Sequence, residues 1–278
     1  MEEWKLSNHD LDIFNTIKIG IIGCGHLGQA ILESLINHGF QKENLFISYR
    51  GNPSTYEKIE KMGLTICISE NERIFNEADV IFITTKPQDV ISLKEIPISQ
   101  NKLIISCLAG LSVEILKKIF KSDICRMMLS GPDTVVAEKG VATIYPYNEL
   151  VGRILSKMNL RIFEISNEKD VDIFTAGVCL PAALLQEDNE VIIKEAIHEI
   201  AKEWATFLDL YEWAKMILPS FTTENEKAEY IARMITKGGV TEAIIDSLKS
   251  GELFVTALRK GITRSKDISL QISNSILN

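Results

Sequence analysis

Apolar and polar positions divide the chain into two parts with different periods. From residue 17 to about residue 165, short apolar and β-branched runs alternate with stretches of helical repeat. The runs cover residues 17–22, 45–49, 80–85, 103–108, 124–129, 140–145 and 161–165. This alternation is typical of a mostly parallel sheet whose faces are covered by helices. We therefore predict an α/β domain over residues 17–165.

Two helices of this part show their ends in the sequence. Leu27, Ile31 and Leu35 recur every four residues and form an apolar stripe, and Gly39 follows where a helix C-terminus favours glycine. Ser112 stands before a second helical repeat, where a serine oxygen can accept the free N–H groups of the first turn.

The strand runs stop after residue 165, and the remainder predicts a helical domain over residues 166–278. The stretch 189–210 presents one broad apolar face, which must meet other helices or a second subunit. Its members are Ile193, Ile197, Ile200, Trp204, Phe207 and Leu208. The polar run 222–229 is interpreted as a connection into the next helix, and strong periodicity ends after Asp267. Residues 1–16 lack the features of a signal peptide and are interpreted as an N-terminal extension.

Composition narrows the class of protein. The chain has 278 residues, is 46% hydrophobic and carries a net charge of −8, which argues against nucleic acid and anionic membranes as partners. No run of about 18 uncharged apolar residues predicts a membrane-spanning helix. The five cysteines are odd in number and mostly lie in apolar runs, which indicates reduced thiols in a cytoplasmic protein. Neither these cysteines nor the four histidines have metal-ligand spacing, so no metal is expected.

A glycine-rich turn follows the first apolar run. Gly23, Gly25 and Gly28 have the G-x-G-x-x-G spacing between a strand and a helix, and His26 and Leu27 lie between the second and third glycines. In this context the first glycine permits a tight turn, the second lets a pyrophosphate approach and the third lets the helix pack on the strand. The five residues are candidate coenzyme contacts in a Rossmann-like domain. The alternative is a turn that keeps its glycines for packing alone.

The end of the second strand bears on the choice of coenzyme. An NAD site usually carries an acidic residue there, whereas this chain has Ser48 and Arg50. A guanidinium and a hydroxyl can receive the 2′-phosphate of NADPH, so NADPH is expected, with NADH as a second possibility. If Arg50 is only a solvated loop charge, the preference stays open.

Three segments resemble the pyrroline-5-carboxylate reductase family. They are TTKPQDV at 84–90, ISCLAGLS at 105–112 and the long segment 236–268, which begins TKGGVTEA and is similar to the family's dimerisation signature. With the glycine turn, the resemblance covers nearly all of residues 17–268. It implies NAD(P)H-dependent reduction of the C=N bond of 1-pyrroline-5-carboxylate to L-proline. It also implies a homodimer that interlocks through C-terminal helices, or a higher oligomer.

The resemblance also implies roles for individual residues. Thr85, Lys86 and Pro87 would form the coenzyme-side loop, and Ala109 with Gly110 would lie beside the nicotinamide. Thr241 would contact the ring nitrogen as the catalytic residue. The further substrate contacts implied are Gly239, Val240, Cys179 and Ser130. From the residues alone, an ordinary N-cap threonine is the simpler interpretation of Thr241. Glu242 could donate a proton, although a first-turn glutamate that favours the helix dipole is the simpler interpretation.

Two motifs depart from the family pattern. The loop M-P-N-T-P reads MLSGP at 128–132, and the segment S-G-S-G-P-A, which gathers the substrate carboxylate, reads GVCLPA at 177–182. Val178, Cys179 and Leu180 cannot supply the missing hydroxyls. Lys237 replaces a proline and could offer a cation instead, although a solvated loop lysine is the simpler interpretation.

Three classes of function remain open after these observations. The first is reduction of a cyclic imine, either 1-pyrroline-5-carboxylate or another small imine or carbonyl-derived compound. The second is a non-catalytic, nucleotide-binding relative that acts in regulation. The third is a dehydrogenase of small hydroxy acids, which would need a catalytic lysine, and neither Lys194 nor Lys202 lies in a supporting motif.

Overall fold

The computed structural model describes residues 14–277, without the side chains of residues 273 and 275–277. A seven-stranded sheet has the order β2-β1-β3-β4-β5-β6-β7. Its strands are β1 (Ile19–Ile22), β2 (Leu45–Ser48), β3 (Val80–Ile83), β4 (Leu103–Ser106), β5 (Asp123–Leu129), β6 (Val141–Tyr145) and β7 (Arg161–Ile162). All neighbours pair in parallel except β5 with β6. The seven predicted strands and the mostly parallel sheet are therefore confirmed.

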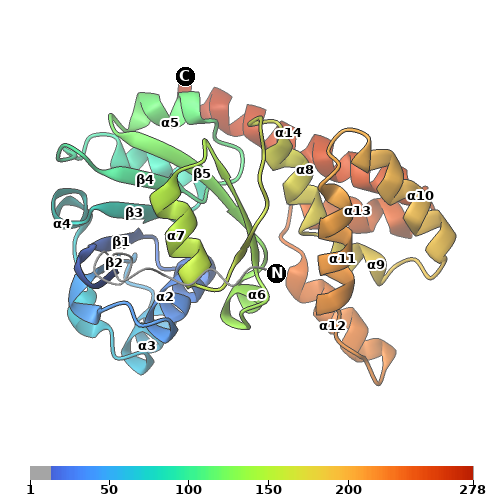
Figure 1. Cartoon of the computed structure of the whole chain (residues 1–278), viewed down its shortest axis with the longest axis horizontal. Helices are drawn as coiled ribbons and strands as arrows, with labels where there is room; N and C mark the ends of the chain where they lie inside the picture. Colours follow the sequence, from blue (N-terminus) through green and yellow to red (C-terminus); the bar gives the residue numbers. More distant parts are fainter. Residues whose placement is uncertain (1–13, 278) are drawn as a thin grey trace.

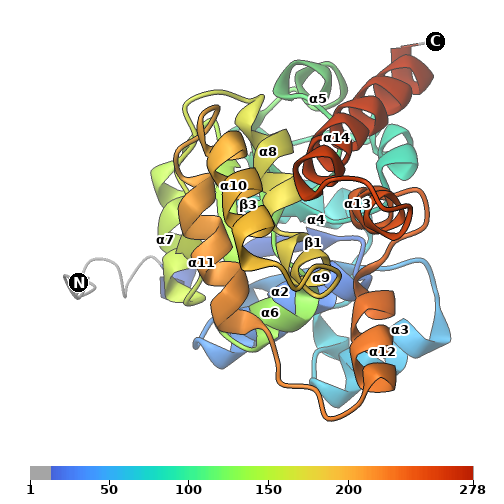
Figure 2. The same ribbon diagram turned by 90° about the vertical axis from the view of Figure 1, so that its right-hand side faces the viewer.

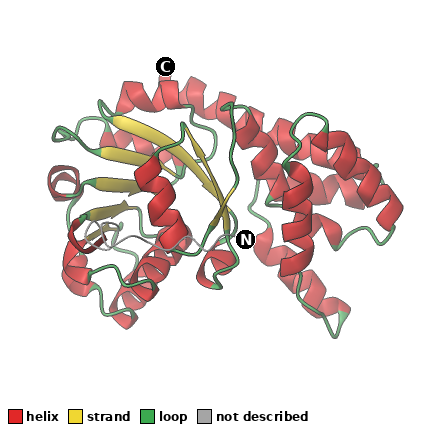
Figure 3. Cartoon of the chain, viewed as in Figure 1, coloured by secondary structure: helices red, strands yellow, loops and turns green. Residues whose placement is uncertain are grey.

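Helices cover both faces of this sheet (Figures 1 and 3). They are α2 (His26–Asn37), α3 (Pro53–Lys61), α4 (Asn71–Glu77), α5 (Val113–Ile119), α6 (Pro132–Val136) and α7 (Glu149–Lys157), with 3-10 turns η1 (Lys42–Asn44), η2 (Thr65–Cys67) and η3 (Pro87–Leu93). One apolar core includes Ile19, Ile31 and Ile154, and the other includes Ile81, Phe75 and Leu116. The predicted N-cap is confirmed, because the Ser112 hydroxyl accepts from the Ile115 N–H at 3.3 Å.

The C-terminal part is helical throughout the described residues (Figure 3). It contains α8 (Asp170–Gly177), α9 (Leu180–Leu184), α10 (Glu190–Ala201), α11 (Phe207–Ile217), α12 (Glu224–Met234), α13 (Val240–Lys249) and α14 (Phe254–Leu277). A separate core joins them, with Phe174, Ile197, Phe207, Ile244 and Leu258 fully buried or nearly so. The predicted fold class, a Rossmann-like domain followed by an all-α region, is confirmed.

The helix boundaries correct two expectations and extend a third. The apolar face over 189–210 belongs to two helices, because the chain turns after Ala201. Trp204 and Phe207 therefore enter the core from a new direction, and Leu208 is 39% exposed. The run 222–229 is mostly helix, since Thr223 and Glu226 form a capping box at the start of α12. The helix of residue 267 continues to Leu277, and Ile272 packs against the core of the N-terminal domain.

Helix α14 links the two parts of the molecule. It packs against α8, α10 and α13 in the helical region and contacts η3 in the N-terminal domain. The two perpendicular views agree on this course, with the C-terminal end of α14 reaching the α/β domain (Figures 1 and 2). The expected extension 1–16 lies outside the described residues up to residue 13. Its Phe14 is buried and packs edge-to-face on Phe40, with ring centroids 5.4 Å apart.

Candidate active site

The glycine turn joins β1 to α2 at the carboxyl edge of the sheet. Gly23 has φ +96°, and a Cβ there would lie 2.7 Å from the Thr85 backbone nitrogen. A Cβ at Gly28 would lie 2.8 Å from the Gly23 carbonyl oxygen. Packing therefore requires the first and third glycines. Gly25 is different, because a Cβ there would meet nothing within 4 Å. Its side faces open space, which is where the pattern expects a pyrophosphate.

The surroundings of this turn fit a dinucleotide. Gly25 is the N-cap of α2, so the free N–H groups of the first helical turn, including those of His26 and Leu27, lie at the open side. The Thr85 hydroxyl is buried and has no hydrogen-bond partner within the described part of the chain. A buried hydroxyl without a partner costs about 1 to 3 kcal/mol, so a ligand that satisfies it would gain affinity.

The residues expected at the adenosine end lie on neighbouring loops. Ser48, at the end of β2, accepts the N–H groups of Gly23 and Cys24 through its carbonyl oxygen at 3.2 and 3.0 Å. Arg50 is 69% exposed, and its Nη2 lies 2.9 Å from the Asp89 carboxylate on η3. Arg50, the residue expected to bind the 2′-phosphate, is thus exposed and already paired with a carboxylate of the same chain.

The two loops expected near the nicotinamide follow β3 and β4. Lys86 is exposed and precedes Pro87 at the start of η3. Ala109 is half-buried, whereas Gly110 is buried with φ +82°, and a Cβ there would lie 2.9 Å from the Ser269 backbone nitrogen. Helix α14 therefore borders the Ala109–Gly110 loop directly. The parallel register brings both loops to the same sheet edge as the glycine turn.

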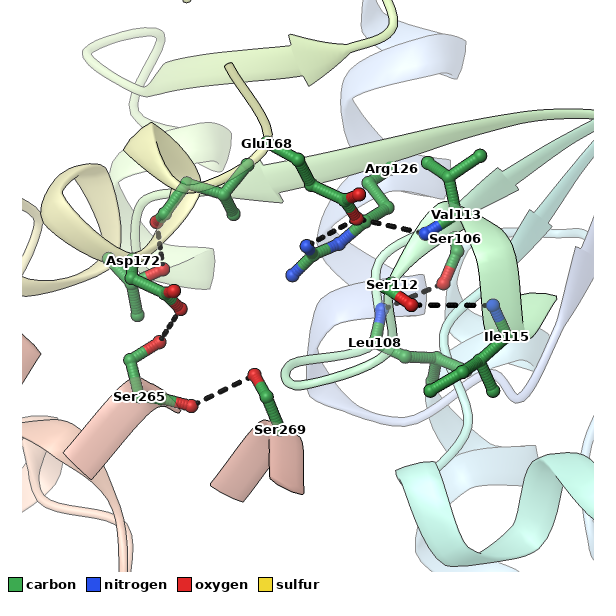
Figure 4. Close-up of polar contacts among 12 residues, drawn as sticks. Ser106, Leu108, Ser112, Val113, Ile115, Arg126, Glu168, Asp172, Ser265 and Ser269 are labelled. Atoms are coloured by element: carbon green, nitrogen blue, oxygen red, sulfur yellow. Dashed lines mark hydrogen bonds and ion pairs between the residues drawn. The ribbon is translucent and has the colours of Figure 1, made fainter. Parts of the chain in front are cut away.

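A partly buried ionic cluster joins the start of α5, which follows this loop, to the helical region (Figure 4). One oxygen of Glu168 accepts from the Arg126 guanidinium of β5 at 2.7 Å and from the Val113 N–H at the start of α5 at 2.8 Å. Beside it, Ser265 of α14 donates to Asp172 of α8 at 2.6 Å. Burial raises the pKa of Asp172 above its ordinary value, which its hydrogen bond from Ser265 partly offsets. The sequence analysis missed this cluster, although an arginine inside the apolar run 124–129 was a visible signal.

Replacing Glu168 with alanine is expected to destabilise the fold by about 2 kcal/mol. The Arg126 side chain is 8% exposed and would remain as an unpaired buried charge, and Val113 would lose an acceptor. Urea unfolding measures the change. The control is Glu114→Ala, whose exposed pair with Lys118 should contribute about 0.5 kcal/mol or less. Equal losses in both variants would show that the cluster is not stabilising.

On the helical side, three groups form a directed chain of hydrogen bonds. The Thr241 hydroxyl donates to the Cys179 sulfur at 3.2 Å, and the Cys179 thiol donates to the Thr175 carbonyl oxygen at 3.2 Å. Burial raises the pKa of Cys179 to about 11, so the thiol keeps its proton near neutral pH. Because a carbonyl only accepts, the chain has one direction. The Thr241 oxygen is left with lone pairs that can accept a further hydrogen bond.

The remaining residues of this region have other contacts. Gly239 is the N-cap of α13, so Thr241 is the second residue of the helix and the N-cap interpretation of it is wrong. Val240 is buried, and Glu242 accepts from the Gly238 N–H at 2.6 Å. Lys237 is exposed.

Ser130 does not lie open at this site. It is 2% exposed, and its hydroxyl is shared with Thr134 at 2.6 Å and accepts from the Val141 N–H at 3.0 Å. As placed, it stabilises the 128–132 loop and presents no hydroxyl to a ligand.

Among the described residues, no group of three or more His, Cys, Asp or Glu side chains is arranged to hold a metal ion. None of the helices in that range combines the length and apolar character needed to cross a bilayer.

Comparison with known proteins gives the class of this site and the family that the chain resembles. The family described as "NADP oxidoreductase coenzyme F420-dependent" matches residues 18–110, and the fold and edge loops place the protein among the oxidoreductases with a Rossmann-like domain. Pyrroline-5-carboxylate reductase 2 of Bacillus subtilis is 27% identical over 94% of this chain and 98% of its own. The Escherichia coli reductase is 34% identical, over 55% of this chain and 58% of its own. At low identity, the chain therefore resembles the pyrroline-5-carboxylate reductases over nearly its whole length.

Solved structures share the fold over nearly the whole chain. The reductase of Coxiella burnetii aligns with a TM-score of 0.59 at 23% identity, over 92% of this chain and 99% of that one. The Plasmodium falciparum reductase, solved with NADP bound, aligns with a TM-score of 0.56 at 22% identity, over 92% and 99%.

Proposed function

We propose that the protein reduces the C=N bond of 1-pyrroline-5-carboxylate to L-proline with NADPH as the preferred coenzyme. The observation that carries the proposal is the hydrogen bond between Thr241 and Cys179. It joins the two segments, 236–268 and 177–182, whose counterparts in the family are expected to hold the substrate. The family relationship, the open face of Gly25 and the unsatisfied Thr85 hydroxyl support the coenzyme.

The proposed reaction needs few catalytic side chains. The reduced coenzyme supplies a hydride to the imine carbon. Protonation of the imine nitrogen makes that carbon electrophilic, and the Thr241 oxygen can accept the N–H of the protonated ring because its own proton is directed to Cys179. The pyrrolidine product keeps that N–H. Residues of the two sheet-edge loops hold the partners face to face and exclude water.

The other parts of the proposal concern assembly and location. We propose a dinucleotide-binding domain over residues 17–165 and a helical domain over 166–278 through which two subunits pair. All five cysteines are free, which supports a reducing, cytoplasmic location.

The direct test is turnover. Purified protein should oxidise NADPH when 1-pyrroline-5-carboxylate is added, with L-proline as the product. Turnover of 1-pyrroline but not of its 5-carboxylate would establish reduction of a less polar imine instead, a candidate that the missing hydroxyls of segment 177–182 favour. Thermal stabilisation by NADPH without turnover of either imine would establish the non-catalytic, nucleotide-binding alternative.

Replacing Asp89 with asparagine is expected to lower the KM for NADPH about 3-fold and to leave the KM for NADH unchanged. The change releases the Arg50 guanidinium for the 2′-phosphate, and an exposed ion pair of this kind contributes about 1 kcal/mol or less. Steady-state kinetics with both coenzymes measure the effect. Glu77→Gln, which breaks the exposed pair with Arg73, serves as a control with no expected change. Equal improvement for both coenzymes would contradict a role of Arg50 at the phosphate.

A further inference from the structure

The proposed substrate carries a carboxylate, and the segment expected to receive it lacks the donors. Cys179 is buried, its thiol donates to Thr175, and it accepts the Thr241 proton. Leu180 is fully buried and presents no polar side-chain atom. A carboxylate in a site that excludes water needs charge-assisted hydrogen bonds, because leaving it without partners costs several kcal/mol. A donor must therefore come from elsewhere if the proposed function holds.

Arg264 of α14 places a positive charge at the same turn. Its Nε and Nη2 both donate to the Gly238 carbonyl oxygen, at 2.8 and 2.6 Å. Gly238 lies three residues before Thr241 and adopts φ +72°, with the Arg264 Nη2 3.5 Å from the position of its absent Cβ. Two of the five guanidinium N–H groups thus fix the side chain to the backbone of this turn.

Among the described residues, none accepts a hydrogen bond from the remaining three N–H groups of Arg264. Over the described range of the chain, no carboxylate lies within ion-pair distance of this guanidinium, and Gly238 is its hydrogen-bond acceptor. This sets it apart from Arg259 on the same helix, which pairs with Glu203 at 2.6 Å, and from Arg126, which pairs with Glu168. Arg264 is half-buried, and the neighbouring Glu242 carboxylate is held on the N–H side of Gly238.

We propose that Arg264 binds the substrate carboxylate and makes the site specific for a carboxylated cyclic imine. This inference rests on the proposed function and extends it to a residue outside segment 177–182. The bond from Arg264 to Gly238 orients the guanidinium, and the free N–H groups form charge-assisted hydrogen bonds to the anion. Thr241 then holds the ring nitrogen of the substrate. Arg264, which is bonded to the turn that precedes Thr241, holds the carboxylate.

The test uses the full-length protein and compares 1-pyrroline-5-carboxylate with 1-pyrroline as substrates, and NADPH with L-proline as ligands. Arg264→Gln should raise the KM for 1-pyrroline-5-carboxylate about 10-fold or more, because hydrogen bonds to charged groups contribute about 1.5 to 3 kcal/mol. The KM values for NADPH and for 1-pyrroline, which has no carboxylate, should stay unchanged. Calorimetry in the presence of NADP should show the same loss of affinity for L-proline. Arg264→Lys keeps the charge and should restore part of the affinity.

Two controls distinguish a role of Arg264 in carboxylate binding from a general effect of the substitution. Arg259→Gln is the matched control on the same helix and should leave both KM values unchanged, and thermal unfolding should show that Arg264→Gln is folded. Equal KM and equal L-proline affinity in wild type and Arg264→Gln, or a KM increase for both imines alike, would overturn the inference. A wild-type protein that turns over neither imine would refute the proposed function, while its L-proline affinity compared with that of Arg264→Gln would still decide the role of Arg264.

Discussion

Thr241→Ala is expected to lower kcat/KM about 100-fold with the imine substrate and to leave the KM for NADPH unchanged. The oxygen of Thr241 is the acceptor proposed for the N–H of the protonated ring, and its loss leaves the charged N–H of the protonated imine without a partner. A 100-fold decrease corresponds to about 2.7 kcal/mol, within the range for a hydrogen bond to a charged group. Steady-state kinetics and thermal unfolding measure the two effects.

The matched variant for this position is Thr241→Ser. Serine keeps the hydroxyl and its hydrogen bond to Cys179, so most of the activity should remain. The structural cost of Thr241→Ala should be small, since the side chain is half-buried and caps no helix. Activity that survives in Thr241→Ala, or is lost to the same extent in Thr241→Ser, would show that the hydroxyl has no role at the ring nitrogen.

Gly25→Val is expected to weaken NADPH binding at least about 100-fold while the fold persists. A side chain at this position meets nothing in the protein, and its backbone angles, φ −79° and ψ −160°, are open to any residue. It would instead fill the space through which a pyrophosphate approaches the N-terminus of α2. The stability cost should stay near 1 kcal/mol, since valine is a poorer N-cap than glycine. Calorimetry with NADPH, together with thermal unfolding, separates the two effects.

Gly28→Ala provides the opposite case. Its new methyl group would lie 2.8 Å from the Gly23 carbonyl oxygen and 2.9 Å from the Thr84 hydroxyl, so α2 must move away from β1. We expect a clear decrease in the unfolding temperature, with coenzyme binding reduced through the altered turn. If Gly25→Val binds NADPH as well as wild type does, the glycine turn has kept its glycines for packing alone, and the coenzyme site must lie elsewhere.

Local signals in the sequence predicted the sheet well. The seven strands were found because buried parallel strands need uninterrupted apolar runs, and the glycine spacing was found because the three glycines stand close together in one turn. The capping box of Thr223 and Glu226 was equally visible and would have started α12 at its observed position. The turn after Ala201 was not visible, since Trp204 and Phe207 continue the helical repeat and yet reach the core by a change of direction.

Helix α14 shows a second limit of periodicity. Its apolar residues pack against the helical core in the first part of the helix and against the N-terminal domain near its C-terminal end. Ile262 lies in the helical core, and Ile272 packs against the core of the N-terminal domain. A helix that changes partner along its length shows no single apolar stripe, which explains why strong periodicity ends after Asp267 although the helix continues to Leu277. The close approach of Ser269 to Gly110 has no sequence signal, because the two residues lie far apart in the chain.

Local sequence patterns were enough to predict the alternation of strands and helices, the phosphate-type turn and the resemblance to the pyrroline-5-carboxylate reductases. These features depend on residues within a few positions of one another, where periodicity and turn chemistry act. Tertiary structure alone decided which polar groups are already satisfied: Arg50 by Asp89, Arg126 by Glu168, and Thr241 by Cys179. Within the described part of the chain, it also left Arg264 with donors that no residue accepts, next to the turn that precedes Thr241. The physical reason is that each such group is satisfied by a partner from a distant segment, and only folding brings the two together.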